Sequence, residues 1–442
     1  MMEDWVEVEI IEVLKRLPNG KFINQGWSPQ CKSSPSANED TWGVLKTTAI
    51  QKNEFLPNQN KELPESKKIR PQLEVNVGDI LLTCAGPRNR CGVSCLVKKT
   101  RKRLLLSGKM YRFQPNPKIL SPNFLILFLQ SLDAWSQIDR MKTGGSESGL
   151  NLTQTRFKKL TFLIPPLPIQ RAIVARIEEL FGSLDQGIAD LQRAQEQLRV
   201  YRQAVLKKLY SSFSGEIKLI KNVVEKVQIG PFGSQLHKAD YISGGIPLVN
   251  PMHIKGGKIV PKLSYSVSVE KRNSLPNYIL KEGDVIMGRR GEMGRAALVT
   301  QKESGWMCGT GSLYLRPFKD CLFSPYLDYY LRSAKAKEVL KENASGTTMR
   351  NLNKRIVNNL SIPIPPIDEQ KKIVQEIESR LSICDQVEAN IQESLAKAEA
   401  LRQSILKKAF EGKLLTAAEI AACKQEADYE PAGVLLERIK AN

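Results

Sequence analysis

The amino-acid sequence predicts an α+β protein built from two similar globular segments, each followed by one long helix. The first observation is a repeat in which IPPLPIQRAIVARIE from Ile164 matches IPPIDEQKKIVQEIE from Ile364, and YRQAVLKKLY from Tyr201 matches LRQSILKKAF from Leu401. The second is a helical spacing of apolar residues inside the repeated blocks. The third is a set of short β-prone runs beside turn residues in the segments before them. An internal repeat of this kind determines the domain organisation.

The repeated blocks predict two long helices that pack against a partner. In the first block, apolar residues recur every seven positions, which is the spacing of a coiled-coil seam. That seam comprises Ile177, Leu184, Leu191, Leu198 and Val205, with Ile173, Leu180, Ala194 and Tyr201 as companions. The second block places Ile373, Ile377, Val387, Ile391, Leu401 and Ile405 at equivalent positions. Neither Gly nor Pro occurs from Ile367 to Phe410, so about 40 residues would form a rod of about 60 Å.

Proline clusters mark the domain boundaries, because a proline can begin a helix but interrupts its interior. They are Pro165, Pro166 and Pro168 before the first helix, and Pro363, Pro365 and Pro366 before the second. We therefore expect a globular domain over residues 1–163, a central spacer helix over 164–215, a second globular domain over 216–362, and a C-terminal spacer helix and tail over 363–442.

The two globular segments resemble each other weakly. NVGDILLTCAG from Asn76 is similar to KEGDVIMGRRG from Lys281, and SPNFLILFLQS from Ser121 is similar to SPYLDYYLRS from Ser324. The loops between such segments differ in length and content. The repeated helical blocks keep the same spacing while the loops of the two globular segments diverge. This predicts two similar recognition domains with two different targets.

The charge balance predicts a polyanionic partner. Lys and Arg number 66 against 46 Asp and Glu, which gives a formal net charge of +20. Nucleic acid and an anionic membrane surface both fit this excess. The sequence has no run of 18 uncharged apolar residues and starts with acids rather than with a basic signal peptide. We expect a cytoplasmic protein without a membrane partner.

Motifs for catalysis and for metal binding are absent from the sequence. An adenine methyltransferase needs Asn/Asp-Pro-Pro-Tyr/Phe, whereas Asn116 and Asn250 are each followed by a single proline. A phosphate-binding loop needs Gly-Lys-Ser/Thr, and neither Lys109 nor Lys258 is followed by such a hydroxyl. The spacing of Cys84, Cys91 and Cys95 does not suit zinc, and there are only two histidines. We therefore expect a non-enzymatic chain with no cofactor or metal of its own.

Three motifs make the chain similar to the specificity subunit of type I restriction-modification systems. They are IPIPPIDEQKKIVQEIE from Ile362, RQSILKKAFEGKL from Arg402 and GPFGSQL from Gly230, and the likeness covers essentially the whole chain. The first helix departs from the pattern, because Pro168-Ile169-Gln170 stands where the second has Asp368-Glu369-Gln370.

The resemblance implies two target-recognition domains, separated by an antiparallel coiled-coil pair of long helices in a pseudo-twofold internal repeat. Each domain would read one half of a split target in double-stranded DNA. Two methyltransferase subunits and the restriction/translocase subunits would dock on the chain, and S-adenosylmethionine, ATP and Mg²⁺ would belong to those partners.

Loops rich in Arg, Ser, Thr and Gln are the candidate DNA contacts, because these side chains suit phosphates and base edges. In the first domain they are Arg88 and Arg90 in GPRNRCG, and Ser146 and Ser148 in GGSESGLN. In the second they are Ser234, Gln235 and Lys238 after GPFG, Arg289, Arg290 and Arg295 in GRRGEMGR, and Thr347, Thr348 and Arg350 in SGTTMRN. A solvated hairpin tip is an equally good explanation of the arginines, since exposed arginines are common.

Two other functions fit the same sequence. The chain could be a structural scaffold whose coiled coil bridges proteins and whose charge serves solubility. It could also be the specificity partner of a related restriction or phage-defence system with a different nuclease.

Overall fold

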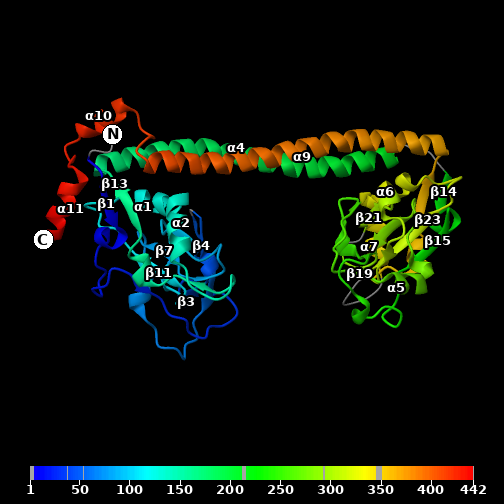
Figure 1. The fold of residues 1–442 in the computed structure, drawn as a ribbon, viewed down its shortest axis with the longest axis horizontal. Helices are drawn as coiled ribbons and strands as arrows, with labels where there is room; N and C mark the ends of the chain where they lie inside the picture. Colours follow the sequence, from blue (N-terminus) through cyan, green and yellow to red (C-terminus); the bar gives the residue numbers. More distant parts are fainter. Residues whose placement is uncertain are drawn as a thin grey trace. The chain divides into compact units, whose positions relative to one another are not determined.

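The computed structural model describes residues 4–36, 38–52, 54–211, 216–291, 294–344 and 351–441. The chain divides into two compact units: unit 1 comprises residues 1–189 and 394–442, and unit 2 comprises residues 190–393. The two long helices, α4 (Leu167–Ser211) and α9 (Ile367–Phe410), each contribute part of their length to both units (Figure 1). Each helix begins within four residues of the predicted boundary.

Unit 1 contains a mixed array of short strands and helices. Its four-stranded antiparallel sheet has the order β2-β11-β7-β9, and its three-stranded sheet has the order β10-β3-β6, in which β3 and β10 are parallel. The strands of these sheets are β2 (Asn24–Gln25), β3 (Gly43–Leu45), β6 (Asn60–Glu62), β7 (Ile80–Thr83), β9 (Ser94–Leu96), β10 (Leu104–Leu105) and β11 (Met110–Phe113). Two-stranded pairs join β1 (Val6–Glu9) to β13 (Thr161–Ile164), β4 (Ile50–Gln51) to β5 (Glu54–Phe55), and β8 (Ala85–Gly86) to β12 (Leu150–Asn151). The short helices are α1 (Pro122–Leu129), α2 (Leu132–Met141) and α3 (Gln154–Phe157).

Unit 2 repeats this arrangement. Its four-stranded sheet has the order β15-β23-β20-β21, and its three-stranded sheet has the order β19-β16-β22 with β16 and β22 parallel. The strands are β15 (Val224–Ile229), β16 (Ile246–Val249), β19 (Ser266–Val267), β20 (Val285–Gly288), β21 (Ala296–Leu298), β22 (Met307–Cys308) and β23 (Ser312–Pro317). Pairs join β14 (Glu216–Leu219) to β24 (Ser361–Ile364) and β17 (Ile254–Lys255) to β18 (Lys258–Ile259). The short helices are α5 (Val269–Ser274), α6 (Ser324–Arg332), α7 (Ala334–Asn343) and α8 (Lys354–Asn358).

The matching sheet orders confirm the predicted α+β fold with two similar domains. The serine N-caps of two equivalent helices show which residues of the two domains correspond. Ser131 caps α2 by accepting a hydrogen bond from Ala134 N, and Ser333 caps α7 by accepting one from Ala336 N. This match gives an offset of 202 residues, so the comparison of Ser121 with Ser324 is wrong by one residue.

The two long helices pair antiparallel inside each unit. In unit 1 the core joins Ile173 and Ile177 of α4 to Ile405 and Leu406 of α9, and in unit 2 another core joins the end of α4 to the start of α9. The heptad stripe of α4 is matched in α9 by Ile377, Cys384, Ile391, Ala398 and Ile405, and all of these except the intermediate Ala398 are buried.

The prediction that three further residues lie in the seam is wrong. Tyr201, Val387 and Leu401 are 40–51% exposed. A helix that faces a single partner covers only one narrow stripe, so companion positions on the outer side of the seam remain in contact with solvent.

One buried glutamine joins each long helix to its domain. Gln170 and Gln370 are both fully buried, and each accepts one backbone hydrogen bond and donates two. Gln170 accepts from Ser121 N (2.8 Å) and donates to Ile119 O (2.7 Å) and Pro165 O (2.8 Å). Gln370 accepts from Phe323 N (2.8 Å) and donates to Cys321 O (2.9 Å) and Pro365 O (2.8 Å). The two helix starts are therefore fixed by the same interaction.

The C-terminal tail folds onto unit 1, where α10 (Ala417–Lys424) and α11 (Ala432–Ala441) lie beside the N-terminal strand (Figure 1). Arg171 of α4 pairs with Glu426 at 2.6 Å and with Asp428 at 2.8 Å. The Tyr429 hydroxyl donates to the Asp4 carboxylate at 2.5 Å. The first and last described segments of the chain thus belong to one packed unit.

Candidate nucleic-acid interface

In unit 2 the fold brings two of the predicted DNA-contacting segments together at the end of β20. Leu352 N donates to Arg289 O at 2.9 Å, and Arg290 Nε donates to Asn351 Oδ1 at 2.8 Å. Asn351, the last residue of the predicted SGTTMRN segment, therefore lies beside the arginine pair. Of that segment, the predicted contacts Thr347, Thr348 and Arg350 lie outside the described residues.

Arg289 is buried, unlike the other candidate arginines that the structure describes. The residue is 9% exposed, and its Nε and Nη1 groups have no hydrogen-bond partner among the residues that the structure describes. Burial and, less strongly, the adjacent Arg290 lower the pKa of the guanidinium. A buried cation without an acceptor is costly, so this position favours a bound anion or a base edge.

In unit 1 the corresponding loops also meet, since Arg88 N donates a hydrogen bond to Glu147 O, but carboxylates neutralise the Arg88 side chain. Arg88 Nε lies 2.7 Å from one oxygen of Glu147, and its Nη1 lies 2.7 Å from Asp139. These carboxylates raise the pKa of Arg88 above its ordinary value, led by the hydrogen bond with Glu147. Beside Glu147, Ser146 and Ser148 are exposed, with hydroxyls 3.3 Å apart. A phosphate would have to displace a carboxylate to bind Arg88.

Arg90 holds a neighbouring hairpin in place. Its Nη2 donates to the carbonyls of Thr47 at 2.7 Å and Ile50 at 2.6 Å, and its Nη1 donates to Gln51 at 3.2 Å. No local sequence pattern indicates these contacts, because the residues are about 40 positions apart. Arg90 is thereby positioned by the β4–β5 hairpin.

The loop after Gly230 presents three predicted contacts at the surface. Ser234, Gln235 and Lys238 are exposed, and Gln235 accepts a hydrogen bond from the Tyr278 hydroxyl at 2.7 Å. Gly230 is required by close packing, since a Cβ there would lie 2.0 Å from Gly309 O. The glycine turn thus positions the polar loop.

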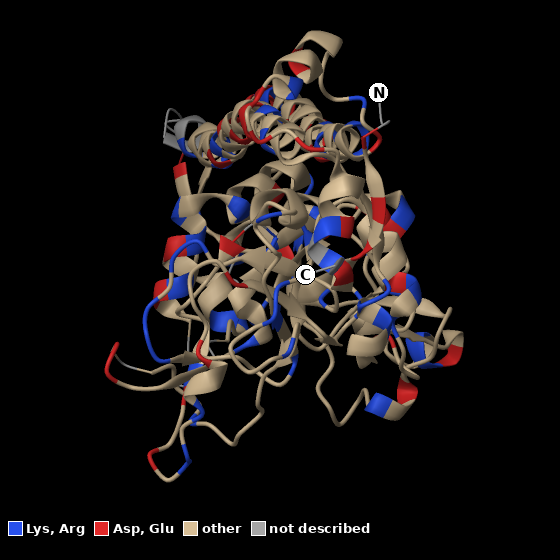
Figure 2. Cartoon of the chain, turned by 90° about the vertical axis from the view of Figure 1, so that its left-hand side faces the viewer, with Lys and Arg blue, Asp and Glu red and all other residues tan. Residues whose placement is uncertain are grey.

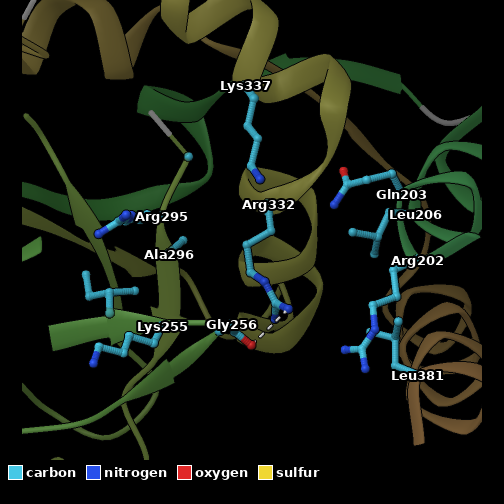
Figure 3. Close-up of a pocket in the computed structure, with 13 residues that line it drawn as sticks. Arg202, Gln203, Leu206, Lys255, Gly256, Arg295, Ala296, Arg332, Lys337 and Leu381 are labelled. Carbon is cyan, nitrogen blue, oxygen red and sulfur yellow. Dashed lines mark hydrogen bonds between the residues drawn. The ribbon is translucent and has the colours of Figure 1, made fainter. Parts of the chain in front are cut away.

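Arg295 lies elsewhere, on the wall of a cavity of about 500 Å³ in unit 2 (Figure 3). The strand side of this cavity carries Lys255 and Arg295, the α6–α7 region carries Arg332 and Lys337, and α4 carries Arg202. Sequence reasoning found only Arg295, because the other four residues come from separate elements without a shared motif.

Charge by itself does not locate an interface. Lys and Arg are interspersed with Asp and Glu along the elements seen in Figure 2. The candidate contacts are therefore defined by the pairing and burial of single side chains rather than by one basic helix.

Two of the clustered cysteines and one histidine are buried in the protein core. Cys84 and Cys95 are buried, and desolvation raises the pKa of each thiol to about 12. His253 is buried, with its Nδ1 3.0 Å from Leu248 O, and desolvation lowers its pKa. Among the described residues, no group of three or more His, Cys, Asp and Glu side chains could hold a metal ion. Within the same residues no helix is both long and apolar enough to cross a bilayer.

Comparisons with known proteins agree with this arrangement. Residues 2–191 and 216–397 match the family described as "Type I restriction modification DNA specificity domain". The chain is 44% identical over 174 residues to the type I restriction enzyme EcoEI specificity subunit of Escherichia coli, covering 39% of this chain and 29% of that protein. It is 23% identical over 425 residues to the StySPI specificity subunit of Salmonella potsdam, covering 91% and 89% of the two chains. The match thus spans less than a third of the first relative and most of the second.

Two solved structures share the fold. One, described as "Structural basis underlying complex assembly and conformational transition of the type I R-M system", has a TM-score of 0.69 at 21% identity and covers 93% of this chain and 98% of its own. The HsdS subunit of Thermoanaerobacter tengcongensis has a TM-score of 0.50 at 20% identity, with the same coverage.

The duplicated fold and the two family matches define a protein with two domains of the DNA specificity type. The chain belongs to the type I restriction-modification DNA specificity family. This confirms the family that the three sequence motifs indicated, and it agrees with the expectation of a recognition subunit rather than an enzyme.

Proposed function

We propose that this chain recognises a bipartite DNA target, with unit 1 and unit 2 each contacting one half-site. The observation that carries the proposal is one fold present twice with different side chains at equivalent loop positions. Arg289 follows β20 where Cys84 follows β7, and each accepts a backbone hydrogen bond from the matching leucine, Leu352 or Leu152. Two scaffolds of one shape with different contact groups are suited to reading two different sequences.

The same proposal assigns partners and cofactors. Two methyltransferase subunits would dock on α4 and α9, and the restriction/translocase subunits would complete the enzyme. S-adenosylmethionine, ATP and Mg²⁺ would be bound by those partners. The naming of relatives as specificity subunits supports this division of labour.

A domain exchange tests the proposal. The chain is expressed with its methyltransferase, and residues 216–362 are replaced by the corresponding domain of another family member. Mapping of methylated bases should show that one half of the recognised sequence changes while the other half is kept. The matched control exchanges residues 1–163 and should change the other half.

The two alternative functions, a structural scaffold and the specificity partner of a related defence system, predict different results. If the chain were only a scaffold, neither exchange would alter the methylated sequence. If it served a related defence system, the exchanges would still redirect recognition, and the neighbouring genes would encode a different nuclease.

A further inference from the structure

The loop that joins β9 to β10 in unit 1, residues 98–103, is strongly cationic, and we call it the basic loop. It contains five cations and no acid in six residues, namely Lys98, Lys99, Arg101, Lys102 and Arg103. It differs in this from the helices and strands of Figure 2, along which Lys and Arg are interspersed with Asp and Glu. Adjacent like charges repel one another and oppose folding, whereas they favour the binding of a polyanion.

Unit 2 has the same loop without the charge. In both units the residue before the loop donates a backbone hydrogen bond to the Asp of the Gly-Asp turn, and the residue after the loop accepts one from the segment before that turn. These bonds are Val97 N to Asp79 O (2.9 Å) and Val75 N to Leu104 O (2.9 Å) in unit 1, and Val299 N to Asp284 O (2.8 Å) and Leu280 N to Trp306 O (2.8 Å) in unit 2. Residues 98–103 thus correspond to 300–305, Thr-Gln-Lys-Glu-Ser-Gly, in which one Lys and one Glu cancel. The fold therefore does not require the positive charge of the basic loop.

Arg103 ends the basic loop in a strained backbone conformation. Its φ is +62°, and among the residues that the structure describes it is the only non-glycine with a positive φ. The corresponding residue of unit 2 is Gly305, with a φ of +89°. Glycine adopts such angles without the steric cost that an arginine incurs. Because strain of this kind clusters at functional sites, we infer that the Arg103 side chain has a use that a glycine would not provide.

The two arginines hold the basic loop against a neighbouring segment of unit 1. Arg103 Nη1 lies 3.3 Å from the Asp40 carboxylate and also donates to Asp40 O. Arg101 donates to Ser36 Oγ and, over 3.3 Å, to Thr41 O. Because these guanidinium groups are held, the basic loop has a defined shape before any ligand binds.

The lysines of the basic loop differ in how available they are. Lys99 and Lys102 are exposed, and neither side chain has a hydrogen-bond or ion-pair partner among the described residues. Lys98 is also exposed, but it lines a groove together with Glu178 and Asp185. Lys99 and Lys102 are therefore the two amines that are available to a polyanion.

The basic loop lies one strand away from the candidate interface of unit 1. From the loop the chain runs through β10 to a turn at Gly108, where Lys109 O accepts a hydrogen bond from Cys84 N at 2.9 Å. Cys84 stands where Arg289 stands in unit 2. Residues 104–107 span about 13 Å when extended. This is close to the ~12 Å width of the major groove, so a duplex whose groove is read at the turn would place its flanking phosphates beside the basic loop.

We propose that the basic loop contacts the phosphate backbone of duplex DNA and that only unit 1 has this anchor. The proposal rests on the proposed function, since it requires unit 1 to contact a half-site. Lysine amines bind phosphates as point charges, and contacts with the backbone carry no sequence information. Unit 1 would therefore hold DNA of any sequence at its surface, whereas unit 2 lacks this sequence-independent contact.

The test compares the loop variant Lys99→Gln/Lys102→Gln with the control Lys21→Gln/Lys159→Gln. The control removes two exposed lysines from other loops of unit 1, which also have no partner among the described residues. Arg103→Gly is a second loop variant, because it introduces the residue that unit 2 has at this position. Each variant is prepared in complex with the methyltransferase subunits, and thermal unfolding checks that it is folded. Duplex binding is measured over a range of salt concentrations, and the methylated bases are mapped.

The loop variant should bind every duplex about fivefold to tenfold more weakly than the control does. Its salt slope should be lower by about 2, because each lost phosphate contact lowers the slope by about 0.9. Arg103→Gly should weaken duplex binding about twofold, since it removes one charge and releases the loop. The methylated sequence should stay the same in all variants, because the removed contacts do not read bases.

Wild-type affinity and salt slope in both loop variants would overturn the proposal and leave the proposed function intact. Loss of the methyltransferase subunits from the loop variant alone would also overturn it, because the basic loop would then bind an acidic protein surface. A changed methylated sequence would mean that the loop reads bases instead of anchoring the backbone. A wild-type complex that binds no duplex would refute the proposed function together with this proposal.

Discussion

Arg202 of α4 forms an ion pair with Asp385 of α9 at 2.8 Å, and the residues at the repeated positions, Arg402 and Asp185, form the same pair with the helices exchanged. The guanidinium carbon of Arg402 also lies 4.5 Å from the centre of the Phe181 ring. One interhelical contact is thus present in each unit. Because both pairs lie at the edge of the seam, they fix the register of the two helices.

Replacing Arg402 should destabilise unit 1. Arg402→Ala removes the ion pair and the contact with Phe181, and we expect a loss of about 1–2 kcal/mol in the free energy of unfolding. Urea unfolding measures it. Arg199→Ala is the control, because the Arg199 side chain is 76% exposed and pairs with Glu196 of its own helix, so its effect should stay within about 0.5 kcal/mol. Equal effects of the two substitutions would contradict a role of Arg402 in helix pairing.

Replacing Gln370 should weaken the junction between α9 and unit 2. Gln370→Leu leaves Phe323 N and the carbonyls of Cys321 and Pro365 without their partner, and we expect a cost of about 2–4 kcal/mol. Scanning calorimetry should detect a lower Tm. The exposed Gln386 of the same helix provides the control Gln386→Leu, whose Tm should change little. An unchanged Tm for Gln370→Leu would contradict the importance of the buried amide.

Asp328 predicts a pH dependence of stability. Burial raises the pKa of this carboxyl to about 6 from an ordinary value of 3.8, although Arg332 opposes the shift. Between these pH values the folded state holds the proton more tightly than the unfolded state does. The contribution of Asp328 to stability is therefore full below pH 4 and is lost as the pH rises through 6.

The variant Asp328→Asn tests this directly, because it cannot titrate. The Tm of the wild type relative to Asp328→Asn should rise as the pH falls from 7 to 4. Asp320→Asn, which makes the same substitution at an exposed position, is the matched control variant. A flat difference for Asp328→Asn would show that the carboxyl titrates normally.

Arg289 should lower stability while it supports DNA binding. Arg289→Met removes a buried charge without a partner among the described residues, and we expect about 1–4 kcal/mol more stability together with weaker DNA binding. Arg316→Met is the contrasting control, because Arg316 is held by Asp284 through two hydrogen bonds of 2.7 Å and its loss should destabilise the fold. Thermal unfolding and duplex binding provide the two measurements. Tighter or equal DNA binding by Arg289→Met would exclude Arg289 from the interface.

The helix pair should set the separation of the half-sites. Inserting seven residues after Gln195 and seven after Ile391 keeps the heptad seam in both helices and lengthens each by about 10 Å. This corresponds to about three base pairs at about 3.4 Å each. Methylation mapping should therefore find a spacer longer by about three base pairs. An unchanged spacer would mean that the helices do not determine it.

The sequence predicted the features that depend on periodicity and repetition. The heptad stripe through Ile177 and Leu184, the proline boundaries and the Gly-Asp turns before β7 and β20 all follow from local rules, and the structure contains each of them. The prediction that Tyr201 and Val387 lie in the seam was wrong, because apolar character alone does not indicate which side of a seam faces solvent.

The candidate site could be predicted only in part. Loop composition identified Arg88 and Arg289, yet one is neutralised by carboxylates more than 50 residues away and the other is buried without an acceptor. These states depend on tertiary contacts that no local pattern encodes. The same holds for Lys255 and Lys337, which reach one cavity from separate elements.

The two units differ in whether they are formed by one stretch of the chain or by two, and this affects how the protein folds during synthesis. Unit 2 is a single continuous stretch, residues 190–393, whereas unit 1 needs residues 394–442 to complete its core with Ile405, Leu406 and Leu435. Domains generally fold as their residues leave the ribosome. The second half of the molecule can thus mature before the first, and a transcript cut short near its 3′ end would yield a chain whose N-terminal domain stays unfinished.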